Sequence, residues 1–267
     1  MDRHTGAGMS EPCPDALVAF VCRLADASGA AIRPHFRRPI PVELKADHSP
    51  VTAADRDAER AIRDLLAGER PNDGIIGEEF GSERADADYV WVVDPIDGTR
   101  AFITGRPLFG TLIACLRHGR PILGVIDQPV TGDRWLGAMG RPTLFNGAPA
   151  RVRTCDTLAK ATLSATSPHM FEADDFAAFE RVRRAGVRDT TYGGDCYAYG
   201  LLAAGFIDLV IESGLKLFDF AALIPVIEGS GGVITDWEGR ALGPGSSGRV
   251  VAAGDARVHA QALGQLA

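Results

Sequence analysis

Two carboxylates three positions apart are candidate metal ligands. Asp94 and Asp97 belong to residues 91–99, which read Trp-Val-Val-Asp-Pro-Ile-Asp-Gly-Thr. At a turn, such a pair can converge on one cation, and the carbonyl of Ile96 between them can add a third oxygen. Hard divalent cations prefer oxygen ligands of this kind. Taken alone, an Asp-Pro-x-Asp-Gly sequence is as often an ordinary turn.

The same loop could also bind an anion. A short apolar strand predicted over residues 89–93 would deliver Asp94 at its end, because Pro95 prevents continuation of the strand. Gly98 permits a tight turn before a helix-like start. Backbone amides around Gly98 and Thr99 would then point toward an anion, as the first amides of a helix do. One short loop could therefore hold a metal and a phosphate together.

Two more acidic segments lie far from this loop in the sequence. Gly-Glu-Glu stands at residues 77–79, and Leu-Phe-Asp-Phe stands at residues 217–220. Taken alone, a glutamate pair is usually a solvated loop, and an aspartate before an apolar helix is usually an N-cap. The order and separation of the three acidic segments change this interpretation.

Together the three segments resemble the inositol-monophosphatase superfamily of metal-dependent phosphatases. That family carries Gly-Glu-Glu, then Asp-Pro-Ile-Asp-Gly-Thr, then a late Trp-Asp-x-Ala-type segment, in which this chain has Phe218 in place of tryptophan. The resemblance runs from about residue 15 to the C-terminus. It implies an α/β fold, the layered αβαβα sandwich of the sugar phosphatases, with an antiparallel sheet in the N-terminal part and the metals between the two halves.

The resemblance also implies roles for single residues around two or three Mg²⁺ ions per site. Glu78 would orient the attacking water, and Thr99 would share that task with support from Asp55. Lys45 matches a basic residue that the family places near the metals, although it could be an ordinary surface lysine. The implied Mg²⁺ ligands are Glu78, Asp94, Asp97, Asp219 and the carbonyl of Ile96. The implied substrate contacts are Asp97, Gly98, Thr99, Gly193, Gly194, Asp195, Glu212 and Asp219.

The flanking sequences look like the histidinol-phosphatase branch of this family. The matching stretches are residues 97–113, 192–199 and 212–219. Histidinol phosphate carries an ammonium and a titratable imidazole, whereas inositol phosphate carries only neutral hydroxyls beside its phosphate. We therefore predict that Asp195 and Glu212 bind the cationic group, a contact worth about 1.5–3 kcal/mol. Asp195 could instead be the N-cap of the helix that follows it.

Three functions are consistent with these patterns. The first is Mg²⁺-dependent hydrolysis of L-histidinol phosphate in histidine biosynthesis, by water activated at the metals. The second is hydrolysis of inositol 1-phosphate, and the third is a regulatory binding protein with vestigial catalysis. The presence of all the expected ligands argues against the third. A Cys-x5-Arg loop, which would indicate a covalent cysteine mechanism, does not occur in the sequence.

Apolar patterns predict the elements that must position these residues. Helices are expected where apolar residues recur at helical spacing, and strands where short apolar runs stand between turn residues. The predicted helices cover residues 15–31, 55–66, 174–184, 196–204, 220–228 and 256–266. The predicted strands cover residues 89–93, 111–117, 121–126, 134–138, 162–165, 206–211 and 233–235. Arg100 and Arg106 are expected at the surface or at an interface.

The length of 267 residues predicts one compact unit made of two halves. We expect a flexible tail at residues 1–13 and an N-terminal half at residues 14–150 that carries most metal ligands. The C-terminal half, residues 151–267, would supply Asp219 and the substrate-specificity strip. Dimers are common in the family, so a homodimer is expected.

Composition excludes several classes of partner. The net charge of 28 − 35 = −7 argues against non-specific binding to nucleic acids or anionic membranes. No apolar run approaches the roughly 18 residues of a membrane helix, and the first residues lack the apolar core of a signal peptide. The five cysteines contain no Cys-x-x-Cys pair, which fits a reduced chain in the cytoplasm. A small phosphate ester is the expected partner.

Overall fold

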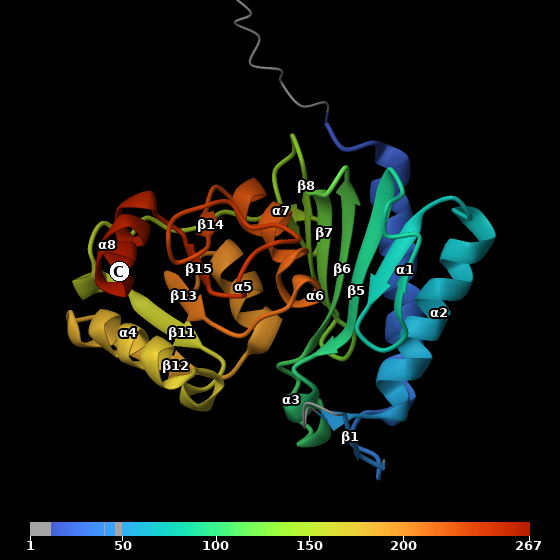
Figure 1. The fold of residues 1–267 in the computed structure, drawn as a ribbon, viewed down its shortest axis with the longest axis horizontal. Coiled ribbons are helices and arrows are strands. Elements are labelled where there is room, and N and C mark those ends of the chain that lie inside the picture. Colours follow the sequence, from blue (N-terminus) through green and yellow to red (C-terminus); the bar gives the residue numbers. More distant parts are fainter. Residues whose placement is uncertain (1–11, 40, 46–49) are drawn as a thin grey trace, which may run out of the picture.

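The computed structural model describes residues 12–39, 41–45 and 50–267. Two large β-sheets alternate with layers of helices in the order αβαβα (Figure 1). Helices α1 and α2 cover the outer face of the first sheet, and α5, α6 and α7 lie between the two sheets. Helices α4 and α8 cover the outer face of the second sheet. The layered fold expected from the resemblance is therefore confirmed.

The first sheet has eight strands, all from the N-terminal half. Their order is β10-β9-β8-β7-β6-β5-β3-β4, and only the β3–β5 pair is parallel among the described strands of this sheet. The strands are β3 (Gly74–Gly77), β4 (Gly81–Glu83), β5 (Tyr89–Asp97), β6 (Gly110–Arg117), β7 (Arg120–Gln128), β8 (Asp133–Ala138), β9 (Leu144–Phe145) and β10 (Ala148–Pro149). The strands predicted at residues 111–117 and 121–126 are confirmed as β6 and β7, which form a hairpin with His118 and Gly119 in the left-handed backbone of a tight turn.

The second sheet has five strands in the order β12-β11-β13-β15-β14. They are β11 (Thr162–Ala165), β12 (Asp189–Tyr192), β13 (Leu209–Glu212), β14 (Val233–Thr235) and β15 (Val250–Ala253). Strand β11 runs parallel to both β12 and β13. Because of this, the C-terminal ends of these three strands meet at one edge, where α/β sheets commonly bind ligands.

The helices form where the sequence places apolar residues on one face. Helix α1 buries Leu17, Val21 and Leu24 against the sheet. Thr52 and Asp55 form a capping box that starts α2 two residues before the predicted residue 55. The helices are α1 (Asp15–Ile32), α2 (Ala53–Glu69), α3 (Thr99–Ile103), α4 (Ala173–Arg184), α5 (Asp195–Ala203), α6 (Leu217–Phe220), α7 (Leu223–Gly229) and α8 (Ala256–Leu266). Short 3-10 turns occupy Arg33–His35, Leu158–Lys160 and Pro168–Met170, and a separate two-stranded sheet joins β1 (Glu43–Leu44) to β2 (Pro50–Val51).

Several predicted boundaries are wrong. Strand β5 does not stop before Pro95 but continues to Asp97, because its pairing with β6 resumes after an irregularity. The predicted helix at residues 220–228 is two helices, α6 and α7, separated by Ala221 and Ala222. The predicted strand at residues 206–211 is the shorter β13, and β15 had no predicted counterpart.

The N-terminal segment is packed from Pro12 onward. Cys13, which the sequence placed in the tail, is 1% exposed, and its N–H donates to the carbonyl of Met139 at 3.0 Å. The rest of the predicted tail, residues 1–11, lies outside the described residues. All five cysteines are free thiols. No helix in the described part of the chain is long and apolar enough to cross a bilayer.

Candidate active site

Three carboxylates from both halves of the chain converge at the end of β5. Asp94 and Asp97 come from β5, and Asp219 comes from α6; each offers an oxygen within 4.8 Å of the others. The N–H of Ile96 donates to Asp94 at 3.0 Å, and the N–H of Lys216 donates to Asp219 at 2.6 Å. These backbone contacts fix the carboxylates in place. Segments more than 120 positions apart in the sequence thus form one acidic cluster.

This cluster fits a hard divalent cation. Burial, together with the charge of neighbouring Glu78, raises the pKa of Asp94 well above its usual range. Burial and the charge of Asp195 do the same for Asp97, and burial raises the pKa of Asp219 to about 7. Three close carboxylates of this kind repel one another unless a cation or protons compensate them. An all-oxygen donor set of this density is what Mg²⁺ prefers.

Glu78 follows β3 and borders the cluster. Its N–H donates to the carbonyl of Val93 at 3.2 Å, so the loop is tied to β5. Lys45 bridges Glu78 and Glu79, with Nζ at 2.7 and 2.6 Å from their carboxylate oxygens. Lys45 is therefore a counter-charge for the glutamate pair, and its place near bound metals stays a prediction.

Glu59 of α2 holds this glutamate loop from behind. Its carboxylate, fully buried, accepts the N–H groups of Glu79 and Phe80 at 2.8 and 3.2 Å. Gly77 is required at this place because a Cβ there would lie 2.0 Å from Glu59 Oε1. Glu59 could not be identified from the sequence, since an acidic residue inside an amphipathic helix gives no signal of a buried contact to a distant loop.

Asp55 and Thr99 lie at the same end of the first sheet but do not share a hydrogen bond within the described structure. Asp55 Oδ2 accepts the N–H and hydroxyl of Thr52, whereas its Oδ1 is buried without a partner among the described residues. The hydroxyl of Thr99 donates to the carbonyl of Ile96 at 3.1 Å. The support of Thr99 by Asp55 stays a prediction, and the unpaired Oδ1 leaves an acceptor available for it.

A cavity of about 520 Å³ opens beside the acidic cluster, between the two halves of the chain. Most of the predicted substrate contacts lie on its wall. The N-terminal half contributes Glu78, Gly98 and Thr99, and the C-terminal half contributes Gly193, Gly194 and Asp195. The cavity thus reaches from the phosphate-binding loop predicted at the end of β5 to the predicted specificity strip.

Asp195 packs directly against Gly98. A Cβ on Gly98 would lie 3.0 Å from Cγ and Oδ2 of Asp195, and Gly98 has φ +87°, so glycine is needed for both reasons. Gly194, not Asp195, is the N-cap of α5, which rules out the capping alternative for Asp195. The N–H of the next residue, Cys196, donates to Asp97 Oδ2 at 2.6 Å. The turn at the start of α5 therefore places the carboxylate of Asp195 on the cavity wall and the N–H of Cys196 against Asp97 of the acidic cluster.

Glu212 lies behind the cavity wall. It is 2% exposed, and its two carboxylate oxygens accept the N–H of Thr166 at 2.7 Å and the hydroxyl of Tyr199 at 3.0 Å. Burial raises its pKa to about 7. A direct contact with substrate would require these two hydrogen bonds to rearrange, so the role predicted for Glu212 in binding a cation stays a prediction.

The cavity wall also contains residues that sequence reasoning missed. Arg100 and Arg106 are exposed, as expected, but they also line the cavity, as do Thr166 and Ser167. Thr166 directly follows β11, at the edge where parallel strands end. Thr166 and Ser167 could have been identified if β11 had been known to be a parallel strand, because ligands commonly bind where parallel strands end.

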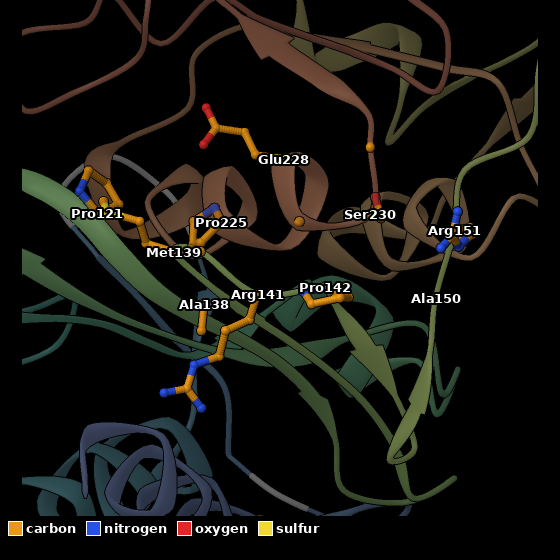
Figure 2. Close-up of a pocket in the computed structure, with 13 residues that line it drawn as sticks. Pro121, Ala138, Met139, Arg141, Pro142, Ala150, Arg151, Pro225, Glu228 and Ser230 are labelled. Carbon is orange, nitrogen blue, oxygen red and sulfur yellow. The ribbon is translucent and has the colours of Figure 1, made fainter. Parts of the chain in front are cut away.

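A second cavity, of about 510 Å³, lies at the other end of the sheets (Figure 2). Its wall includes Pro121, Met139, Pro225 and Glu228, and none of the predicted site residues. Figure 2 shows the side chains of Glu228 and Arg141 pointing away from each other. Because its charged groups do not converge, this cavity offers no comparable chemistry.

Comparisons with known proteins agree with this geometry. The model of the inositol monophosphatase family matches residues 14–267. The bifunctional phosphatase IMPL2, chloroplastic, of Arabidopsis thaliana is 52% identical over 261 residues, covering 94% of this chain and 75% of the relative. A histidinol-phosphatase of Chlorobaculum parvum is 34% identical over 230 residues, covering 85% of this chain and 87% of the relative.

Solved structures give the same result. An inositol monophosphatase from Zymomonas mobilis is 51% identical, superposes with a TM-score of 0.87, and covers 94% of this chain and 98% of its own. An inositol monophosphatase of Thermotoga maritima is 26% identical with a TM-score of 0.85 over 94% of this chain and 96% of its own. The chain therefore belongs to the inositol monophosphatase family, whose members are phosphatases that use divalent metal ions.

Proposed function

We propose that this chain is a Mg²⁺-dependent phosphomonoesterase that hydrolyses L-histidinol phosphate to L-histidinol and phosphate. The observation that carries the reaction class is the buried cluster of Asp94, Asp97 and Asp219 beside the active-site cavity. The observation that favours this substrate is the carboxylate of Asp195 on the cavity wall.

The proposed mechanism needs no covalent phospho-enzyme. When bound, Mg²⁺ ions lower the pKa of a water molecule, neutralise the phosphate charge and stabilise the leaving alkoxide. The ligands would be Glu78, Asp94, Asp97, Asp219 and the carbonyl of Ile96. This set combines a pre-formed acidic cluster with Glu78, which is already oriented by Lys45.

The remaining steps belong to the chain's own groups. The N–H groups of Gly98 and Thr99, at the start of α3, would donate to phosphate oxygens, as helix starts do. Glu78 and Thr99 would orient the attacking water, which Asp55 would support through its unpaired buried oxygen. Because the loop is bounded by Gly98 with φ +87°, its amides can approach the phosphate closely.

Asp195 would recognise the cationic part of the substrate. Its carboxylate stands across the Gly98 turn from the acidic cluster, on the C-terminal wall of the cavity. A substrate whose phosphate lies on the Gly98 amides would place its ammonium or imidazole within reach of this wall. Neutral hydroxyls of an inositol ring gain less from an ionised carboxylate, so Asp195 favours histidinol phosphate.

Inositol 1-phosphate is the second candidate substrate. It is favoured by the 51% identity to a protein named as an inositol monophosphatase. The metal cluster serves both substrates equally, so only the cavity wall can discriminate between them. Arg100 on that wall partly offsets the charge of Asp195, and this weakens the preference for a cation.

Phosphate release in the presence of Mg²⁺ tests the proposal, with L-histidinol phosphate and inositol 1-phosphate compared at equal concentrations. We expect a preference for histidinol phosphate of at least about tenfold in kcat/KM, or roughly 1.4 kcal/mol. A preference for inositol phosphate would be consistent with the proposed metal site but would refute the assignment of histidinol phosphate as the substrate. Release from neither substrate, with an Asp97→Asn variant indistinguishable from the wild type, would overturn the phosphatase assignment as well.

Location and assembly complete the proposal. The five free cysteines, four of them buried, suit a reducing compartment such as the cytoplasm. A homodimer is proposed from the family resemblance, and size-exclusion chromatography with light scattering tests it. The proposed partner is a small phosphate ester.

A further inference from the structure

Strand β5 contains an extra residue at the position of the metal ligands. Asp94 pairs with Leu112 of β6, and Asp97 pairs with Gly110. Two residues of β5, Pro95 and Ile96, therefore lie opposite the single residue Thr111. Two residues facing one across a strand pair is a β-bulge, which bends the strand and redirects its side chains.

The bulge is what brings the two aspartates to one face. In a regular strand, successive side chains alternate, so residues three apart point to opposite faces. Before the bulge this rule holds, since Val92 packs between the two sheets and Val93 packs against α1 and α2. Asp94 continues the face of Val92, and Asp97 would share the face of Val93. One extra residue reverses the alternation, and both carboxylates join the same cluster.

A pair of buried hydroxyls holds this bulge. Thr111 Oγ1 donates to the carbonyl of Pro95 at 2.8 Å, and Ser28 Oγ of α1 lies 3.0 Å from Thr111 Oγ1. Both side chains are 0% exposed. Because the single hydroxyl proton of Thr111 goes to Pro95, Ser28 must be the donor in the second hydrogen bond. The bulge is thus linked to the middle of the sheet and to α1.

We propose that Thr111 and Ser28 are positioning residues that maintain the spacing of Asp94 and Asp97 for metal binding. This inference rests on the proposed metal-dependent function. Neither residue lines the active-site cavity or belongs to the acidic cluster, and the hydroxyl pair acts through the Pro95 carbonyl. Without the Thr111 hydroxyl, that buried carbonyl loses its donor, and the bulge can relax toward conformations in which the two carboxylates no longer converge.

Calorimetric titration of the full chain with Mg²⁺ tests the proposal without depending on activity. Thr111→Val keeps the shape and removes the hydroxyl, and we expect it to weaken Mg²⁺ affinity by about 10- to 100-fold, as losses of outer-shell groups do. Thr111→Ser restores the hydroxyl and is expected to recover the affinity. Ser28→Ala is expected to give a smaller loss in the same direction.

Thr143→Val is the matched control. Thr143 is also fully buried, and its hydroxyl donates to the carbonyl of Val226 at 2.7 Å, far from the acidic cluster. We expect Thr143→Val to lower the melting temperature, as Thr111→Val does, but to leave Mg²⁺ affinity unchanged. Equal affinities of Thr111→Val and wild type would overturn the inference, as would equal losses in both valine variants.

The outcomes also separate this inference from the proposed function. If the wild type binds no Mg²⁺ and Asp97→Asn changes nothing, the metal-dependent function itself fails. If the wild type binds Mg²⁺ and Asp97→Asn abolishes binding, the function stands, and the Thr111 variants then decide the positioning role alone.

Discussion

Replacing Asp195 by asparagine removes one negative charge from the cavity wall and preserves the side-chain shape. The backbone dictates this choice, because Asp195 has φ +45°, a left-handed conformation that asparagine tolerates and alanine resists. The hydrogen bond from the next N–H to Asp97 does not involve the Asp195 side chain and should persist. The variant therefore isolates the contribution of the charge to substrate recognition.

The expected magnitude follows from the surroundings of the carboxylate. Asp195 is partly buried beside Gly98, and Arg100 partly offsets its charge. A charge-assisted hydrogen bond contributes roughly 1.5–3 kcal/mol. Because of Arg100 we expect the lower end, a loss of about 10- to 30-fold in kcat/KM for L-histidinol phosphate. Hydrolysis of inositol 1-phosphate should change little, since its hydroxyls are neutral.

Steady-state kinetics on both substrates measure this difference. Asp189→Asn is the control, because Asp189 is exposed at the opposite end of β12 and should have no effect. A loss of equal size for both substrates would show that Asp195 supports the site as a whole. An unchanged kcat/KM for histidinol phosphate would refute the assignment of Asp195 to the cationic group.

Three further predictions concern the same site and the stability of the second half. Asp219→Asn should abolish Mg²⁺ binding, as measured by calorimetry. It should also raise the melting temperature of the metal-free protein, because it removes one of three mutually repelling buried carboxylates. No change in either quantity would contradict the assignment of the acidic cluster as a metal site. Gly98→Ala should lose far more activity than Gly132→Ala, because both glycines have positive φ (+87° and +82°) but only at Gly98 would the new methyl meet Asp195, at 3.0 Å. Equal activities would show that this close packing is unimportant. Burial lowers the pKa of His259 below its ordinary value of 6.5. As the pH falls through that value, the unfolded chain takes up a proton that the folded chain does not, so the free energy of unfolding should fall. Urea titrations at pH 7.5 and 5.5 should show a smaller fall for His259→Gln than for the wild type.

Local patterns in the sequence were sufficient to predict most of the elements. The helix beginning at Asp15 and the strand at residues 162–165 follow directly from apolar spacing, and the structure has them with almost unchanged bounds. The acidic segments around Asp94 and Asp219 were recognisable because their residue types are unusual at turns. These features depend only on residues that are close together in the sequence, so one sequence is enough to predict them.

Features that depend on distant partners could not be predicted. Pro95 indicated the end of a strand, whereas the structure continues β5 through a bulge whose Pro95 carbonyl accepts the hydroxyl of Thr111 from β6. The carboxylate of Glu212 has the charge needed to bind a cationic substrate group. In the structure, however, Thr166 and Tyr199 donate hydrogen bonds to its two oxygens. Its surroundings are set by the packing of three separate elements.

The arginines of the cavity wall show the same limit. Arg100 and Arg106 belong to no recognisable motif, and their place follows from how α3 meets the turn before α5.

The helix predicted over residues 220–228 is wrong for a different reason. Its apolar residues are continuous because both α6 and α7 are buried between the sheets, so periodicity could not reveal the break at Ala221.

The hydrogen bond from Cys196 to Asp97 spans 99 positions of the chain and has a consequence for biosynthesis. A ribosome releases the eight-stranded sheet long before the turn at Gly194 and the helix that carries Asp219 emerge. During that interval the nascent chain holds Asp94 and Asp97 without their distant partners. Domains generally begin to fold from the N-terminus during synthesis. The complete acidic cluster therefore becomes available only when the last fifth of the polypeptide is being made.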